Sequence, residues 1–428
     1  MIPIIEATTQ KDVVNAILKR TQFDFTDVND SVEAIVNDVK TNKDSAVRRY
    51  TKRFDKASIK TFKIEQATID GAFERVSDTL VNDLKRAAAN IREFHQKQAP
   101  TDTTLKDRDG VVLKEKVRPI ERVGIYVPGG SAAYPSTVLM NAIPAVIAGV
   151  KRIVMVTPPS ADGTIKDALL VAASIAGVDE IYTVGGAQAV AALAFGTQSI
   201  PKVDKIVGPG NIYVTVAKRI VSGYVGIDIV AGPSEIVVLA DETTNPQYAA
   251  ADMLSQAEHD PYASSIVLST SSSVAARIKE AAIEQTKSLS RRGIIQQSLE
   301  KNSAIIVCDS ISQQLELSNA IAPEHLEVLT KDADSIAEQV INAGAIFIGA
   351  YTPEPVGDYF AGPNHTLPTS GSARFSSALS TRDFIKITAI TKYSKAALEE
   401  AGEAIINIAN EEGLTAHANA VRLRLEES

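Results

Sequence analysis

The chain has 428 residues, of which 45% are hydrophobic and 22% are charged, and its formal net charge is −8 at pH 7. This length predicts at least two domains, and this composition is typical of a soluble globular protein. The acidic balance argues against a nucleic-acid partner, because phosphates attract clusters of Lys and Arg.

The cellular compartment is indicated by three further features. Cys308 is the single cysteine, which excludes an internal disulfide, and its apolar neighbours in SAIIVCDS predict a buried, inert thiol. The longest apolar run, VLMNAIPAVIAGV, is too short to span a bilayer. The first twenty residues contain no basic segment followed by an apolar one, so we expect no secretory signal. These features predict a cytoplasmic protein without a membrane partner.

The first 120 residues are expected to be mainly helical and polar. Apolar residues recur at spacings of three and four in DVVNAILKRT, SVEAIVNDVKTNKDSAVRRYTKRFD and FERVSDTLVNDLKRAAANIREFHQKQ, which is the pattern of an amphipathic helix. His95 lies in the last of these segments, away from any glycine loop, and is expected at the surface.

An alternation of strands and helices begins near residue 122. Short β-branched runs end in Gly or Pro in RVGIYVPGG, RIVMVTPP, EIYTVGG, DKIVGPG and GIDIVAGPS, with helical patterns between them. A second series of the same kind runs from SEIVVLAD to AIFIGAY. Strands that alternate with helices predict parallel sheets covered by helices.

We therefore predict an α/β protein with two Rossmann-like parallel-sheet domains, helices on both faces, and helical segments at both ends. Residues 1–25 are expected to form an N-terminal helical segment. Residues 26–122 together with 236–380 are expected to form the main α/β domain. Residues 123–235 would form the second α/β domain, and residues 381–428 a C-terminal helical segment.

Four glycine-rich turns directly follow predicted strands: YVPGGSAAYPS, VGGAQAVAA, VGPGNIYV and AGPSEI. In open parallel sheets, ligands bind at the carboxyl ends of strands, and glycine allows backbone amides to approach phosphates or rings. The G-x-G-x-x-G fingerprint of dinucleotide sites is absent. Each turn alone is better explained as an ordinary tight turn, and only the series of four favours a ligand.

Four of the five histidines follow residue 255, and each has a carboxylate or carboxamide nearby in the sequence. The pairs are Gln256 with His259, Glu324 with His325, Asp358 with His365, and Glu412 with His417. Gln256 and His259 are three residues apart, so that they would share one face of a helix. A single histidine beside a glutamine is usually a solvated pair, but four polar histidines flanked by Gly or Pro favour a site.

Two kinds of chemistry suit these residues. Zinc binds imidazole nitrogen and carboxylate oxygen, and with a single cysteine its ligands would come from His, Asp, Glu and Gln. The H-E-x-x-H pattern is absent, which argues against an ordinary metalloprotease. The adjacent Glu324 and His325 could supply two proton-transfer groups from a turn, which suits general acid–base catalysis better than metal binding.

Several of these stretches together resemble the histidinol dehydrogenase family over most of the chain. They are SQAEHD, IAPEHLE, YVPGGSAAYPSTVLMNAIPA, VGGAQAVAALAFGT, VGPGNIYV, AGPSEIVVLAD and VGDYFAGPNHTLPTSGSARFSSALSTRDFIK. Residues before about 85 match weakly and carry no motif. The resemblance implies oxidation of L-histidinol to L-histidine, the last step of histidine biosynthesis, with two hydride transfers to NAD and a requirement for zinc.

The resemblance also implies roles for individual residues. The zinc ligands would be Gln256, His259, Asp358 and His417, and the catalytic pair would be Glu324 and His325. Substrate contacts would fall on Ser234, His365 and Glu412, on His325 and on the four zinc ligands. NAD contacts would fall on Tyr126, Gln188 and Asn211. Family members are homodimers whose C-terminal segment reaches the partner's site, so Glu412 and His417 would serve the neighbouring subunit.

Two other functions remain open from the residues alone. The same zinc ligands could activate water against an amide or ester, as in a zinc hydrolase. A protein with two α/β domains and a cleft could also bind a ligand without catalysis. The resemblance favours the dehydrogenase over both.

Overall fold

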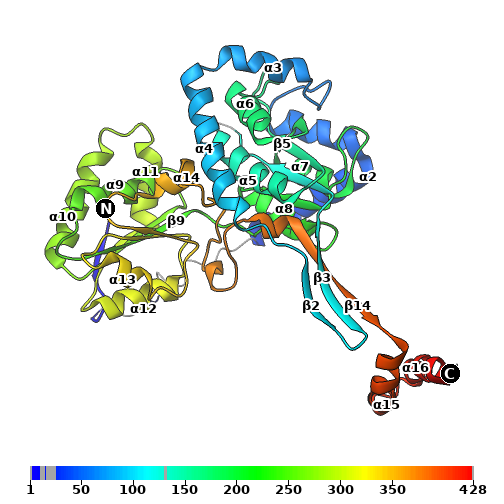
Figure 1. Ribbon diagram of the computed structural model, residues 1–428. Helices are drawn as coiled ribbons and strands as arrows, with labels where there is room; N and C mark the ends of the chain where they lie inside the picture. Colours follow the sequence, from blue (N-terminus) through cyan, green and yellow to red (C-terminus); the bar gives the residue numbers. More distant parts are fainter. Residues whose placement is uncertain (1, 10–14, 16–25, 130–132, 427–428) are drawn as a thin grey trace. The chain divides into compact units, whose positions relative to one another are not determined.

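The computed structural model describes residues 2–9, 15, 26–129 and 133–426 of the chain. It divides into two compact units (Figure 1). The first comprises residues 1–98 and 120–384, and the second comprises residues 99–119 and 385–428. None of the described helices is long and apolar enough to cross a membrane.

One parallel sheet of the first unit has the strand order β6-β5-β4-β7-β8. Its strands are β4 (Arg122–Tyr126), β5 (Arg152–Thr157), β6 (Glu180–Thr183), β7 (Lys205–Val207) and β8 (Gly226–Ile227). In β5, Ile153 and Met155 belong to one apolar cluster, whereas Val154 and Val156 belong to another. Successive side chains of a strand point to opposite faces, so both faces of this sheet are buried.

Seven helices of the described residues pack around this sheet. They are α2 (Thr26–Phe54), α3 (Gln66–Arg75), α4 (Asp78–Gln96), α5 (Pro135–Ala148), α6 (Asp167–Ala176), α7 (Gly186–Phe195) and α8 (Ile212–Val221). Helix α2 packs on α7 and α8, α3 on α6, and α4 on α5 and α6. This packing differs from the expected division, which grouped residues 26–122 with residues 236–380. Amphipathic periodicity identified the helices, but it does not say which sheet their apolar faces cover.

The other parallel sheet of the first unit has the strand order β1-β11-β10-β9-β12-β13. Its strands are β1 (Ile4–Glu6), β9 (Glu235–Ala240), β10 (Ser264–Ser269), β11 (Ala304–Val307), β12 (His325–Val328) and β13 (Ala345–Ile348). The α/β class with helix-flanked parallel sheets is thereby confirmed. The expectation of helix throughout residues 1–25 is wrong for Ile4–Glu6, which pairs with Ile305–Val307 of β11. Most of the rest of that segment lies outside the described residues.

The helices on this sheet lie on both of its faces. They are α9 (Pro246–Ala257), α10 (Ser272–Thr286), α11 (Arg292–Lys301), α12 (Ile311–Ile321), α13 (Ala333–Ala337) and α14 (Glu354–Tyr359), followed by the short 3-10 turns η1 (Ser372–Arg374) and η2 (Thr381–Phe384). Cys308 is buried directly after β11, as expected. Burial raises the pKa of its thiol to about 12, so the thiol is protonated and inert at neutral pH.

The second unit consists of an antiparallel sheet and two helices. The sheet has the order β14-β3-β2, with β2 (Thr103–Arg108), β3 (Val111–Pro119) and β14 (Ile385–Tyr393). Helices α15 (Lys395–Glu411) and α16 (Thr415–Glu426) pack against each other. The expectation of mainly helical structure is wrong for these strands. The first five residues of β14, IKITA, alternate apolar and polar residues, which is the period of a strand.

Candidate functional site

Glu324 and His325 lie where β12 begins, between β9 and β13, and both are buried. Residue 235, at the start of β9, contacts both. Its backbone N–H donates to Oε2 of Glu324 at 3.0 Å, and its carbonyl oxygen accepts from Nδ1 of His325 at 3.2 Å. The main chain of one residue therefore holds both members of the predicted catalytic pair.

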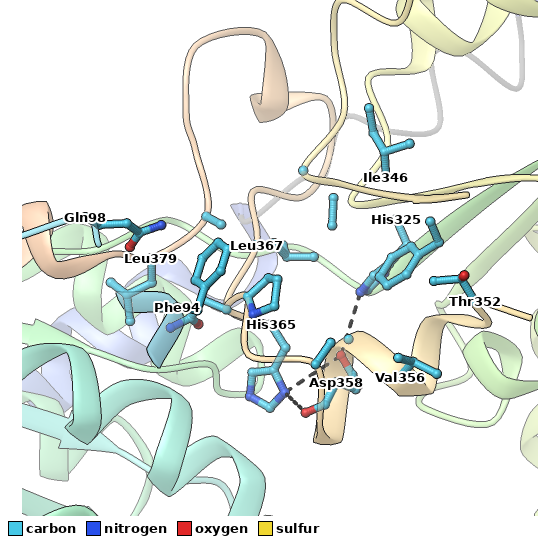
Figure 2. A pocket seen from close by; sticks show the side chains of 18 residues that line it. Phe94, Gln98, His325, Ile346, Thr352, Val356, Asp358, His365, Leu367 and Leu379 are labelled. Carbon is cyan, nitrogen blue, oxygen red and sulfur yellow. Dashed lines mark hydrogen bonds and ion pairs between the residues drawn. The ribbon is translucent and has the colours of Figure 1, made fainter. Parts of the chain in front are cut away.

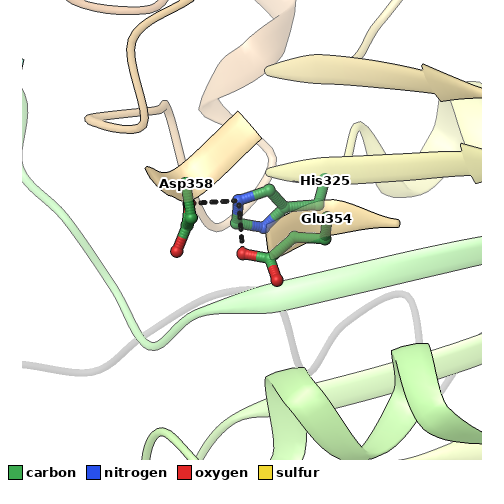
Figure 3. Close-up of side chains that lie close together, drawn as sticks. All are labelled: His325, Glu354 and Asp358. Atoms are coloured by element: carbon green, nitrogen blue, oxygen red, sulfur yellow. Dashed lines mark ion pairs between the residues drawn. The ribbon is translucent and has the colours of Figure 1, made fainter. Parts of the chain in front are cut away.

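This arrangement defines which nitrogen of His325 is free. A carbonyl oxygen can only accept, so Nδ1 carries the proton and Nε2 keeps a lone pair. Nε2 is buried without a hydrogen-bond partner, 3.7 Å from Oε1 of Glu354 and 3.9 Å from Oδ1 of Asp358 (Figure 3). Burial lowers the pKa of His325 to about 4. The imidazole is therefore neutral at physiological pH and can accept a proton at Nε2.

The carboxyl groups around His325 are shifted in the opposite direction. Burial raises the pKa of Glu324 well above its usual range. Burial, together with the charge of Asp358, raises the pKa of Glu354 to about 9. The backbone N–H of Glu354 donates to Oε1 of Glu327 at 2.7 Å, and burial together with Asp252 raises the pKa of Glu327 as well. These acids oppose one another's ionisation, so burial and mutual repulsion favour their protonated forms, and Glu354 holds its proton at neutral pH.

Sequence reasoning missed Glu235, Glu327 and Glu354. The available signal was an acidic residue inside a buried strand, as in EIVVLA of β9 and HLEV of β12. The carboxylate of Glu235 accepts from the backbone N–H of Ser370 at 2.8 Å. Burial raises its pKa to about 7, and hydrogen bonds from the backbone of Ser370 and Gly371 oppose that shift. Glu235 thus also connects β9 to the segment that follows His365.

Asp358 and His365 line the same cavity as His325 (Figure 2). The carbonyl oxygen of Asp358 lies 3.0 Å from Nδ1 of His365, and Oδ1 of Asp358 lies 3.7 Å from the same nitrogen. Nε2 of His365 is buried without a partner. The cavity has a volume of about 360 Å³, and Phe94 and Gln98 of the α4 segment also line it. Its size and its mixture of apolar and polar walls suit a small polar molecule.

Gln256 and His259 lie at the end of α9. Gln256 is fully buried, and both its amide oxygen and its amide nitrogen lack partners. Desolvation lowers the pKa of His259, which the charge of Asp358 partly opposes. The residue as a whole is nevertheless exposed. A buried amide without partners and a neutral imidazole are the donors that a metal ion would satisfy.

Two donor sets for a metal overlap at Asp358. His325, Glu354 and Asp358 have ligand atoms within 4.8 Å of one another. The predicted set places Gln256, His259 and Asp358 in the first unit and His417 in α16 of the second unit. The first set includes Nε2 of His325, the nitrogen that a general base would need. Glu412 caps the C-terminal end of α15, and both Glu412 and His417 are exposed.

The predicted NAD contacts lie at the carboxyl ends of the other sheet. The hydroxyl of Tyr126 accepts from the backbone N–H of Gly186 at 3.0 Å, and burial raises the pKa of Tyr126 to about 12. Gln188 is buried with neither amide atom partnered. Asn211 caps α8 by accepting from the backbone N–H groups of residues 213 and 214. An unpartnered buried amide beside a glycine turn fits a bound polar group such as a nucleotide.

Two further sequence expectations concern Ser234 and His95. Ser234 is half-buried immediately before β9, next to the residue that holds the catalytic pair. His95 was expected at the surface, but it is fully buried, with Nδ1 2.7 Å from Oε1 of Gln98. His95 is buried because α4 packs against α5 and α6 on the face that carries His95.

A buried neutral base, clustered metal donors and glycine turns on parallel sheets define a candidate enzyme site on an α/β fold. A family model described as histidinol dehydrogenase matches residues 18–425. The chain is 50% identical to a histidinol dehydrogenase of Clostridium acetobutylicum, with 92% of each chain covered. It is 49% identical to that of Listeria innocua, with 98% of each chain covered. The crystal structure of histidinol dehydrogenase from Elizabethkingia anophelis matches with a TM-score of 0.94 at 40% identity, covering 100% of this chain and 98% of that one.

The chain therefore belongs to the histidinol dehydrogenase family. It is an oxidoreductase of histidine biosynthesis, and the family implies NAD and a metal. Neither a hydrolase nor a non-catalytic binding protein is supported by these relatives.

Proposed function

We propose that this enzyme performs the zinc-dependent four-electron oxidation of L-histidinol to L-histidine through L-histidinal, with two hydride transfers to NAD. The observation that carries the proposal is the buried, neutral His325. Its free Nε2 lies beside Asp358 and lines the same cavity as His365. This geometry supplies a base next to metal donors, which oxidation of an alcohol on a metal-bound substrate requires.

We assign the zinc ligands to Gln256, His259, Asp358 and His417. The NAD contacts are assigned to Tyr126, Gln188 and Asn211. Ser234, His365 and Glu412 complete the substrate contacts. When bound, zinc supplies positive charge that orients the imidazole and amine of the substrate, and NAD accepts the hydride at each oxidation.

In the first oxidation, His325 takes the hydroxyl proton of the alcohol at Nε2, which allows the hydride to leave the carbinol carbon. The carbonyl oxygen of Glu235 holds Nδ1 during this step, so the imidazolium that forms keeps its orientation. The product is the aldehyde, which must add water before a second hydride can leave.

In the second oxidation, ionised Glu324 takes a proton from the water that adds to the aldehyde, while the imidazolium of His325 gives its proton to the aldehyde oxygen. Neutral His325 then takes a proton from a hydroxyl of the hydrate as the second hydride leaves. A carboxyl group with a raised pKa is a stronger base once it is ionised, which suits Glu324 to this step. Cys308 takes no part, because its thiol is buried and protonated.

The direct test is histidinol-dependent NADH formation with and without a chelator, reported per mole of histidinol consumed. Two NADH per histidinol, abolished by the chelator and restored by zinc, is the expected result. One NADH per histidinol would limit the reaction to the aldehyde. Zinc-dependent turnover without NADH would instead support a hydrolase.

We further propose a cytoplasmic homodimer in which Glu412 and His417 serve the partner's site. Mixing a His259→Ala chain with a His417→Ala chain tests this arrangement under conditions that exchange subunits. In a shared arrangement one site of each mixed dimer carries both lesions and the other carries none, so activity recovers towards half that of an unmodified dimer. Verified exchange without recovery would show that each site is built within one chain.

A further inference from the structure

Two buried charges lie behind the glycine turn that joins β7 to α8. Lys218 of α8 and Asp228, which follows β8, form an ion pair, and each side chain is 2% exposed. Nζ of Lys218 donates to the carbonyl oxygen of Gly208 at 3.0 Å. Oδ2 of Asp228 accepts from the backbone N–H of Gly208 at 2.7 Å. The ion pair therefore holds both polar groups of one main-chain residue.

The backbone conformation of Gly208 is one that side-chain-bearing residues rarely adopt. Gly208 has φ +109°, and a Cβ at this position would lie 2.2 Å from the carbonyl oxygen of Tyr126. The turn thus lies directly against the end of β4. Three residues later, Asn211 caps α8 with its side-chain oxygen. The position of residue 208 consequently affects two of the three proposed NAD contacts, Tyr126 and Asn211.

Stability alone is a poor explanation for such a pair. Desolvation of a buried ion pair opposes its Coulombic attraction, and apolar replacements are often equally stable or more stable. Paired charges in a buried position can instead specify one local geometry. Here the geometry specified is that of a turn at the carboxyl end of a parallel strand, where ligands bind.

We propose that Lys218 and Asp228 are positioning residues for the nucleotide, and that they act through the Gly208–Asn211 turn. This inference rests on the proposed NAD site at Tyr126, Gln188 and Asn211. Both side chains are buried, so they act on the turn and do not touch the nucleotide. Loss of the pair releases the turn and weakens NAD binding, while the zinc donors on the other sheet are unchanged.

The test compares Lys218→Met, Asp228→Asn and the double variant Lys218→Met/Asp228→Leu with Lys205→Met as the matched control. Lys205 lies at the opposite end of β7, where its Nζ donates to the carbonyl oxygen of Asp383 at 2.7 Å. The double variant leaves no unpaired buried charge, so it provides the measurement if a single variant does not fold. The measured quantities are the Kd of NADH from its fluorescence, the KM values of NAD and histidinol, and zinc content.

We expect the Kd of NADH and the KM of NAD to rise roughly tenfold or more in the pair variants, which corresponds to about 1.4 kcal/mol. The KM of histidinol and the zinc content should stay at the level of the control. Unchanged NADH binding in a folded pair variant would overturn the inference. So would a parallel deterioration of NAD, histidinol and zinc binding, which indicates a general structural role. If the unmodified enzyme itself fails to bind NADH, the proposed function fails first.

Discussion

The two parallel sheets of the first unit carry different kinds of residues at their functional ends. Beside β12, His325, Glu324 and Glu354 are buried ionisable groups whose pKa values are displaced from their usual ranges. At the ends of β4 and β6, Tyr126 and Gln188 are uncharged at neutral pH. Tyr126 and Gln188 lie at the carboxyl ends of their strands, where open parallel sheets bind ligands. Glu324 and His325 instead lie at the amino end of β12. The parallel architecture alone therefore does not determine where the reactive groups gather.

Substitutions beside the two sheets should therefore change different measured properties. Residues beside β12 should control metal content and proton transfer, whereas residues beside β4 to β8 should control nucleotide affinity. A substitution beside β12 that weakens nucleotide binding, or one beside β4 to β8 that lowers metal content, would contradict this expectation.

The largest effect is expected from His259→Ala, which removes one of four proposed zinc ligands. Activity should fall below detection together with zinc content, measured by elemental analysis, while NADH fluorescence reports unchanged nucleotide binding. Asp260→Asn is the control, because Asp260 is exposed and its side chain accepts from the backbone N–H of Tyr262. Stoichiometric zinc and full activity in His259→Ala would remove this residue from the ligand set.

His325→Asn should lower kcat roughly 10²–10⁴-fold, the range for loss of a general base. Both oxidation steps should be slowed, because the same nitrogen accepts a proton in each. Zinc content and the Kd of NADH should stay unchanged, which distinguishes this variant from His259→Ala. Slowing of one step alone would assign the other step to a different base.

Glu324→Gln should impair the aldehyde step more than the alcohol step. Glutamine keeps the shape and can still accept from the backbone N–H of Glu235, but it cannot take a proton from water. Supplying histidinol and histidinal separately and following NADH measures each step. Equal losses in the two steps would mean that Glu324 has no specific role in activating water.

Glu235→Gln should lower kcat about tenfold, because a glutamine places an N–H₂ group where the carboxylate accepts from the backbone of Ser370 and Gly371. Ser370→Gly is the matched control. Ser370 adopts φ +54°, which glycine tolerates better, and the backbone N–H is kept. A kcat that is lower in the control than in Glu235→Gln would show that the hydrogen bonds from the backbone of Ser370 and Gly371 to Glu235 do not support catalysis.

The smallest effect concerns stability and pH at Asp55, which follows α2. Burial raises its pKa to about 6 in the folded chain, and Oδ2 has no hydrogen-bond partner. Because the folded state binds this proton more tightly, stability falls as pH rises from about 4 to about 6 and then levels off. Asp55→Asn should therefore stabilise the protein at pH 7 by about 1 kcal/mol, after allowance for partial exposure, and should change little near pH 4.

Asp44→Asn provides the opposite sign in the same measurement of thermal unfolding. Burial would raise the pKa of Asp44, but hydrogen bonds from Ser199 and Thr197 outweigh burial and lower it. Its stabilising contribution is present above the unfolded pKa and is lost as pH falls, so the substitution should destabilise the protein at pH 7. A stabilising Asp44→Asn would show that the hydrogen bonds do not dominate.

The parallel sheets could be predicted because their signals are local. Strands such as β5 and β7 are short β-branched runs that end at Gly or Pro, and each is followed by a helical pattern. The strand β1 could not be predicted in this way. It forms only because Ile4–Glu6 pairs with residues 305–307, about three hundred residues further along the chain.

The site residues that are close together in the sequence could be predicted. The residue that holds them through main-chain hydrogen bonds could not. Glu324 and His325 stood out as neighbours in APEHLE. The role of residue 235 depends on the register of β9 against β12, which no short stretch contains. Similarly, the burial of His95 depends on the helices that cover α4.

The buried carboxyl cluster beside β12 implies a conflict between activity and stability. Glu327 and Glu354 are buried acids without a cation among the described residues beside them, so they oppose folding as pH rises. Amide replacements at these positions should be enriched when a variant library is selected for thermal resistance alone. Replacement of Glu354, which lies 3.7 Å from Nε2 of His325, should disappear when the library must support growth without added histidine. The site thus sets an upper limit on how far this fold can be stabilised while it still works.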